Sequence, residues 1–145
     1  MDTTNSSGKS STAMTEFVIL TAIIVVLAVF AVPRFRDAAE RSKAGEAFNY
    51  LNAVKAAQER YRAKKGSYAP ELSELDITLT VPKYFTIGSV HAGNTGSLAD
   101  SWTLTLTRMD PQTRYGAYTV VFTQGGFDHN KSTIAQKETI NPAGG

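Results

Sequence analysis

The chain of 145 residues is long enough for one folded domain, and its 42% hydrophobic and 19% charged residues are typical of a folded protein. It contains no cysteine, so it offers no disulfide, no thiolate metal site and no cysteine nucleophile. A net charge of +2 is too small to indicate a nucleic acid or a membrane surface as partner by itself. The charges are unevenly distributed, however, because residues 34–65 carry nine basic and four acidic side chains, whereas residues 66–145 carry five and seven.

The N-terminal third combines a polar segment with a strongly apolar one. Residues 1–11 are rich in Ser, Thr and Gly and show no apolar period, which predicts a leader segment that is disordered or removed. Residues 17–32, with the sequence FVILTAIIVVLAVFAV, then form a run of sixteen residues without a charge. A membrane-spanning helix needs about 20 apolar residues, with a range of roughly 17 to 25. Ala13, Met14 and Pro33 extend the run to near that length, so we expect residues 17–32 to be the membrane-spanning half of a helix.

The helix is expected to continue beyond the apolar run. Pro33 removes one helical hydrogen bond and predicts a kink or a short break. Apolar residues then recur at spacings of three and four, as on one face of an α-helix; they are Ala44, Ala47, Phe48, Leu51, Val54, Ala57 and Tyr61. Lys64 and Lys65 followed by Gly66 are typical of a helix end. The predicted helix therefore covers residues 12–65, or roughly 80 Å at about 1.5 Å per residue.

Residues 66–145 read as a small β-rich head. A short helix is predicted over residues 69–76, where Pro70 suits a first helical position. Strands are predicted at residues 84–90, 102–108, 118–123 and 133–140, separated by turns at 91–97, 109–116 and 125–131. Residues 102–108 alternate large apolar residues with threonine, which is the clearest strand pattern in the chain. The predicted fold class is therefore α+β, with a long kinked helix packed on an antiparallel sheet of three or four strands.

Several roles are open for the apolar run when the residues alone are considered. A cleaved secretory signal has the right length, but only Lys9 supplies charge before it and no A-x-A site follows. A plain single-span anchor would, by the positive-inside rule, place the basic residues and the head in the cytoplasm. A soluble core helix is disfavoured because the run is apolar on every side.

Glu16 is the single charge that adjoins the apolar run, and an ionised carboxylate near lipid costs a few kcal/mol. Such a residue usually has a partner of opposite charge. Cleavage between Ser11 and Thr12 would create an amino group four residues before Glu16, which places both charges on one helix face. The new amino group could equally meet the carboxylate of a neighbouring subunit.

These features resemble the superfamily of type IV pilins and type II secretion pseudopilins. In that family a peptidase cuts before a helix with Glu as fifth mature residue and Pro near the twenty-second. With Thr12 counted as first, Glu16 is fifth and Pro33 is twenty-second, and the V-P-R-F continuation at residues 32–35 also matches. Residues 61–68, YRAKKGSY, resemble the link between helix and head. Ser11 stands where the family usually has Gly, Thr12 where it usually has Phe, and the C-terminal cysteine pair of many pilins is absent.

The resemblance implies a structural subunit that polymerises through its apolar helix into a type IV pilus filament, a homo-oligomer with roles such as motility or adhesion. It implies a precursor in the bacterial inner membrane, cleavage of residues 1–11 at Ser11 and Thr12 by a prepilin peptidase, and extracellular assembly by the pilus machinery. Glu16 and Pro33 are the expected assembly residues. A pseudopilin that drives protein export, and a membrane-anchored binding domain that never polymerises, remain as alternatives.

No catalytic, cofactor-binding or metal site is predicted, and we expect the protein not to be an enzyme. His91 and His129 lack metal-ligand spacing and read as solvated turn residues. Asp128 and Asn130, two apart among glycines, suggest calcium, but two such residues are too few for the six to eight oxygens that Ca²⁺ takes, so a hairpin turn is favoured. The basic half of the helix could contact DNA, although a solvated face that pairs with acidic heads of neighbouring subunits is favoured.

Overall fold

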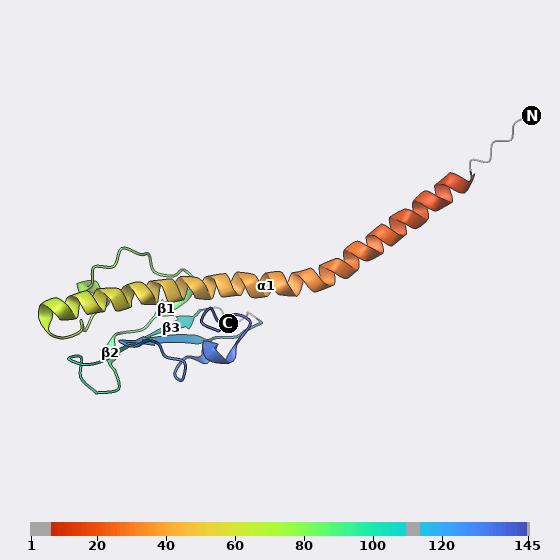
Figure 1. Cartoon of the computed structure of the whole chain (residues 1–145). Coiled ribbons are helices and arrows are strands. Elements are labelled where there is room, and N and C mark those ends of the chain that lie inside the picture. Colours follow the sequence, from red (N-terminus) through yellow and green to blue (C-terminus); the bar gives the residue numbers. More distant parts are fainter. Residues whose placement is uncertain (1–6, 110–113, 145) are drawn as a thin grey trace, which may run out of the picture. The chain divides into compact units, whose positions relative to one another are not determined.

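The computed structural model describes residues 7–109 and 114–144, and the chain divides into two units at residues 1–38 and 39–145. The first six residues of the predicted leader lie outside the described residues, as do residues 110–113 of the predicted turn at 109–116. One helix, α1 (Ser7–Lys65), contributes to both units (Figure 1). The head adds two short 3-10 helices and five strands; these are η1 (Leu72–Glu74), β1 (Phe85–Ile87), β2 (His91–Ala92), β3 (Trp102–Arg108), β4 (Thr119–Thr123), β5 (Gly126–Phe127) and η2 (Thr133–Gln136).

The bounds of α1 agree with the prediction at the C-terminus and differ from it at the N-terminus. The helix begins at Ser7 rather than at the predicted Thr12, because extending an existing helix adds one hydrogen bond for each residue fixed. Pro33 lies inside the helix, so the predicted alternative of a short break is wrong. At the other end Gly66 adopts a φ of 84° and donates its N–H to the Arg62 carbonyl at 2.8 Å, as expected for a glycine-terminated helix.

The head contains one antiparallel sheet, and the predicted α+β fold class is confirmed. The strands lie in the order β1-β3-β4-β5, with β2 pairing the same edge of β3 as β1. In β3 the apolar residues Trp102, Leu104 and Leu106 are buried, while Thr107 on the opposite face is exposed. Thr105 of β3 pairs with Val121 of β4, which fixes the register of the two central strands. The alternation in the sequence therefore predicts both that β3 forms and which of its faces is buried.

Several of the predicted head elements differ from the structure. Residues 84–90 do not form one strand, since β1 ends at Ile87 and the next strand, β2, begins at His91. Residues 133–140 do not form a strand, because residues 133–136 are the 3-10 helix η2. The short helix predicted over residues 69–76 is reduced to the single turn η1.

Side-chain hydroxyls explain why residues 133–140 do not have to form a strand beside β4. Thr133 Oγ1 accepts the backbone N–H of Thr119 at 2.8 Å, and Ser132 Oγ accepts that of Val121 at 2.8 Å. Both donors lie in β4, in the part of the strand that the short strand β5 does not pair. The hydroxyls therefore satisfy edge groups that would otherwise invite another strand.

We expect Ser132→Ala to lower the free energy of unfolding by about 1–3 kcal/mol, because it leaves the buried N–H of Val121 without a partner. Unfolding of the full chain in a mild non-ionic detergent can be followed through its single tryptophan. Ser73→Ala is the matched control, since Ser73 is exposed and should change stability by less than about 0.5 kcal/mol. Equal stability of the Ser132 variant and the native chain would contradict this role.

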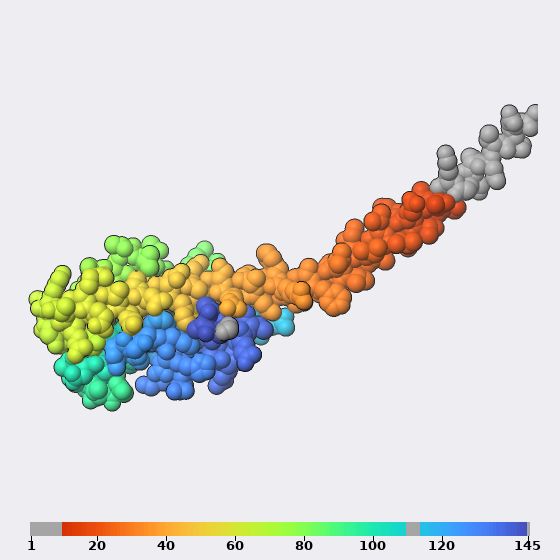
Figure 2. Space-filling view, viewed as in Figure 1, coloured from red at the N-terminus to blue at the C-terminus, as the bar shows by residue number. Residues whose placement is uncertain are grey.

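The hydrophobic core lies between the sheet and one face of α1, and the two are seen packed together in Figure 2. The predicted helix face is buried from Ala44 to Ala57, whereas Tyr61 at its end is only partly covered. Phe48 of α1 packs edge-on against Phe122 of β4, with ring centroids 5.6 Å apart, and also contacts Phe127 of β5. The core thus brings α1 into contact with β4 and β5, which are far from it in sequence.

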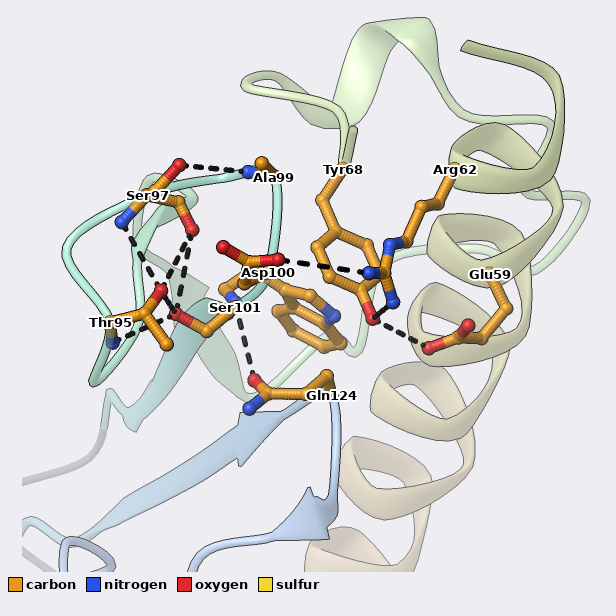
Figure 3. Close-up of polar contacts among 10 residues, drawn as sticks. Glu59, Arg62, Tyr68, Thr95, Ser97, Ala99, Asp100, Ser101 and Gln124 are labelled. Atoms are coloured by element: carbon orange, nitrogen blue, oxygen red, sulfur yellow. Dashed lines mark hydrogen bonds and ion pairs between the residues drawn. The ribbon is translucent and has the colours of Figure 1, made fainter. Parts of the chain in front are cut away.

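Tyr68 fastens the end of α1 to the head (Figure 3). Its hydroxyl donates to Glu59 Oε1 at 3.1 Å and accepts from Arg62 at 3.2 Å, and its backbone N–H donates to the Leu98 carbonyl at 2.8 Å. Burial, together with the Glu59 carboxylate, raises the pKa of Tyr68 above its ordinary value. The YRAKKGSY link is therefore a fixed connection rather than a loose one.

The loop that faces Tyr68 is held by its own hydroxyls. Ser101 Oγ lies 2.6 Å from Thr95 Oγ1 and accepts the Thr95 N–H at 3.1 Å, as Figure 3 shows. The Arg62 guanidinium lies 4.0 Å from the Asp100 carboxylate across the same region. These contacts give the end of the head remote from Arg108 a defined shape.

Candidate functional site

The most unusual surface of the chain is its apolar segment, residues 17–32 of α1. Its large side chains are exposed by 48% at Val32 to 73% at Phe17, and none of the most apolar window is buried within the chain. By length and composition this stretch can cross a membrane. A helix that is apolar on every side is typical of surroundings made of lipid or other helices, so this surface is the candidate functional site of the first unit.

One face of the apolar segment is shaped for close packing. Ala22 leaves a shallow apolar hollow that is lined by Ile19, Ile23, Val26 and Leu27. Small residues on an apolar helix allow another helix to approach closely, which strengthens van der Waals contact. Thr21, the polar residue of the apolar segment, donates its Oγ1 hydroxyl to the Phe17 carbonyl at 2.8 Å. The residues that line the hollow are all apolar, which suits contact with a helix or a lipid chain.

The structure brings the predicted processing and assembly residues onto one helix. Ser11, Thr12 and Glu16 are all exposed, and four residues, about one turn, separate Thr12 from Glu16. Thr15 Oγ1 donates to the Ser11 carbonyl at 2.8 Å, so the bond between Ser11 and Thr12 lies within ordered helix. Among the described residues none forms an ion pair with Glu16. Pro33 lies seventeen positions further along the same helix and is exposed.

A buried charge cluster in the head was missed by sequence reasoning; it consists of Glu40, Arg108 and Tyr118. Arg108 Nε donates to Glu40 Oε1 at 2.6 Å, and Arg108 Nη2 donates to Glu40 Oε2 at 3.2 Å. The Tyr118 hydroxyl donates to Glu40 Oε1 at 2.9 Å. The Arg108 and Glu40 side chains are only 1% and 4% exposed. A bidentate pair with a third donor is the arrangement in which a buried carboxylate is well satisfied.

The sequence contains a signal for this cluster. Glu40 precedes Ala44 by four residues and so extends the apolar helix face by one turn. Arg108 extends the buried series of β3 at two-residue spacing after Leu106. A charged residue at each of two core-facing positions is a reason to pair them across the helix and the sheet.

The electrostatics of the cluster follow from its burial. Burial raises the pKa of Glu40, but the hydrogen bonds from Arg108 and Tyr118 and the charges of Arg108 and Lys43 outweigh it, so the pKa lies below its ordinary value. Burial and the Glu40 carboxylate together raise the pKa of Tyr118. Glu40 is therefore ionised and Tyr118 protonated at neutral pH, which is the state that the hydrogen bonds require.

The side chains considered for metal binding have other surroundings. Asp128 Oδ1 accepts the backbone N–H groups of Asn130 and Lys131, both at 3.1 Å, so its carboxylate is engaged in a turn. His129 is exposed in that turn, whereas His91 is exposed in β2 rather than in a turn. Within residues 7–109 and 114–144 no three His, Cys, Asp or Glu side chains come together as a metal site.

Comparison of the chain with protein-family models, with curated proteins and with solved structures found no match.

Proposed function

We propose that the chain is a structural subunit, a pilin, which polymerises through its N-terminal helix into a type IV pilus filament at the cell surface. The observation that carries this proposal is the exposed apolar segment with Glu16 at its start, attached to a head that has a hydrophobic core of its own. The spacing of Thr12, Glu16 and Pro33, which resembles that of type IV pilins, adds to it.

The proposed assembly follows from the same surface. In the precursor the apolar segment lies in lipid, and in the filament the same side chains pack against apolar segments of other subunits. Cleavage after Ser11 would expose an amino group on Thr12, and Glu16 of an adjacent subunit would pair with it. An unpaired charge in an apolar bundle is costly, so this pairing favours one register over the others. Because the Ser11–Thr12 bond is helical, the peptidase must unwind that turn before cutting.

The first test is the intact mass of the chain recovered from the surface fraction of its native host. A mass that lacks residues 1–11, with or without one methyl group, is the expected result. An uncut chain that stays in the inner membrane would overturn the filament proposal and leave the single-span anchored domain.

The second test isolates Glu16. We expect Glu16→Gln to reduce the yield of sheared filaments at least tenfold, because a few kcal/mol of unpaired charge remains at the Thr12 amino group. The amount of precursor in the membrane should not change. Glu46→Gln is the matched control, since Glu46 is an exposed carboxylate on the head half of α1 and its loss alters the net charge equally. Normal filament yield from the Glu16 variant would show that this pairing does not direct assembly.

A further inference from the structure

The turn that follows β5 contains a short sequence pattern with a defined chemistry. Residues 130–132 read Asn-Lys-Ser, which fits the Asn-X-Ser or Asn-X-Thr pattern, with X other than proline, that accepts an oligosaccharide on asparagine. The pattern occurs a second time at Asn5, in the predicted leader, which the apolar segment separates from the head in sequence. Residues 39–145 therefore contain it once.

A three-residue pattern arises often by chance, so the surroundings of each residue decide what it can do. Asn130 is exposed, and within residues 7–109 and 114–144 its carboxamide takes part in no hydrogen bond. Its backbone is held instead, because its N–H donates to Asp128 Oδ1 at 3.1 Å. The Ser132 N–H donates to the Asp128 carbonyl, also at 3.1 Å. A sugar on the Asn130 carboxamide therefore extends into water and displaces no packed side chain.

The third residue of the pattern has the opposite surroundings. Ser132 is only 3% exposed, and its Oγ accepts the Val121 N–H at 2.8 Å. The same hydroxyl donates to the Val121 carbonyl at 3.4 Å. The acceptor pattern requires this hydroxyl, but in the folded head it is buried against β4. A transferring enzyme can therefore reach both Asn130 and Ser132 only before the head has folded.

From these observations we propose that Asn130 carries an N-linked oligosaccharide, which is added while the head emerges unfolded from the membrane. The donor class is an oligosaccharide joined through a diphosphate to a membrane lipid. Asn130 Nδ2 forms a bond to the sugar C1, the bond from C1 to the diphosphate oxygen breaks, and the lipid diphosphate leaves with that electron pair. One Nδ2 proton passes to a base of the transferase, and nothing is oxidised or reduced. The inference rests on the proposed function for the export of the head.

Folding then separates the two groups that the transferase needs together. Ser132 moves to the edge of β4, and Asn130 stays at the surface with its sugar. Asp128 Oδ1 also accepts the Lys131 N–H at 3.1 Å, so the turn is held without any contribution from the Asn130 carboxamide. The modified chain can therefore reach the same fold as the unmodified one.

The test uses the chain recovered from the surface and membrane fractions of its native host. Trypsin cleaves after Arg114 and after Lys131 or Lys137, which releases Asn130 in peptide 115–131 or 115–137. We expect this peptide to carry the mass of an oligosaccharide. Because the peptide also contains Thr119 and other hydroxyl residues, electron-transfer fragmentation is needed to place the sugar. The expected position is Asn130.

A pair of variants connects the added mass to the pattern. Asn130→Gln should lose the sugar completely, while the amount of chain and its unfolding midpoint stay unchanged. Asn94→Gln is the matched control, since Asn94 is also an exposed head asparagine but Gly96 stands where the pattern requires a hydroxyl. This control should keep all of its sugar. Sugar that persists in the Asn130 variant would overturn the assignment.

The order of the two events has its own test. Chain made in a host without the transferase is folded in mild detergent and then incubated with membranes of the native host. A second sample is synthesised in a cell-free extract that contains the same membranes. We expect sugar only on the second sample, because the Ser132 hydroxyl is buried in the first. Equal modification of both samples would show that the folded head is an acceptor and would overturn the proposed order.

Failure of this inference is distinguishable from failure of the proposed function. A sugar-free peptide from chains that reach the surface would overturn glycosylation and leave the filament in place. Sugar found on Thr119 or Thr123 instead of Asn130 would overturn it as well. Modified Asn130 in an uncut chain that stays in the inner membrane would support the inference and overturn the filament.

Discussion

Replacing Glu40 with Gln is expected to lower the free energy of unfolding of the head by about 3–5 kcal/mol, because the buried Arg108 guanidinium then loses its bidentate ion pair with the Glu40 carboxylate. Gln keeps the shape of the side chain, so the loss reports charge rather than volume. Since small domains are stable by only about 5–15 kcal/mol, the variant should be partly unfolded at moderate temperature. Denaturant unfolding of the full chain in mild detergent, followed by Trp102 fluorescence, gives the measurement.

A double-mutant cycle separates the pair from its surroundings. Arg108→Met alone leaves the Glu40 carboxylate buried with Tyr118 and Lys43 as its partners among the described residues, and it should also be strongly destabilised. Glu40→Met combined with Arg108→Met removes both charges, and we expect it to be more stable than either single variant. If the losses of the single variants simply add in the double variant, the two side chains are not coupled and the assigned role is wrong.

The pH profile gives a second check on the same cluster. The folded-state pKa of Glu40 lies below its ordinary value, so the unfolded chain takes up the proton first as the pH falls. The stability that Glu40 contributes is therefore complete above its ordinary carboxyl pKa and is lost as the pH falls through the lowered folded pKa. The Glu40→Gln chain should show a shallower loss of stability over that acidic range than the native chain.

Much of the fold follows from two periodicities. The three- and four-residue spacing from Ala44 to Ala57 gives the buried face of α1, and the two-residue alternation from Trp102 to Arg108 gives the bounds of β3. Gly66 marks the helix end because its positive φ is a local property of the residue. These signals are local, so a single sequence contains them in full.

The errors occur where the outcome depends on residues distant in sequence. Residues 133–140 have the composition of a strand, but Ser132 and Thr133 instead turn their hydroxyls to the edge of β4, a preference that cannot be seen without β4 in place. The shortening of the predicted strand 84–90 to β1, with β2 following at His91–Ala92, likewise depends on the course of β3. At the candidate assembly surface the sequence predicts the apolar run and Glu16, since both are local. The partner of Glu16 belongs to another chain in the proposed filament and stays a prediction.

The second large effect is expected at Trp102, which is fully buried beneath the end of α1, with its ring centre 6.4 Å from that of Tyr68. Trp102→Ala should lower the free energy of unfolding by about 3–5 kcal/mol, because it leaves a cavity between the sheet and the helix. Far-UV circular dichroism is the suitable probe, since this substitution removes the only tryptophan. Thr103→Ala, the next residue of β3 on the opposite face, is the matched control and should cost less than about 1 kcal/mol.

Trp102→Phe distinguishes the two parts of this effect. Among the described residues the indole N–H has no hydrogen-bond partner, and a buried donor without a partner costs about 1–3 kcal/mol. Phe removes that donor while keeping an aromatic ring against Tyr68, so the gain from the lost N–H offsets part of the lost volume. We therefore expect the Phe variant to lose no more than about half of what the Ala variant loses. If Trp102→Phe and Trp102→Ala are equally destabilised, the indole N–H has a hydrogen-bond partner in the folded chain. Ring volume alone would then not explain why tryptophan occupies this position in the core.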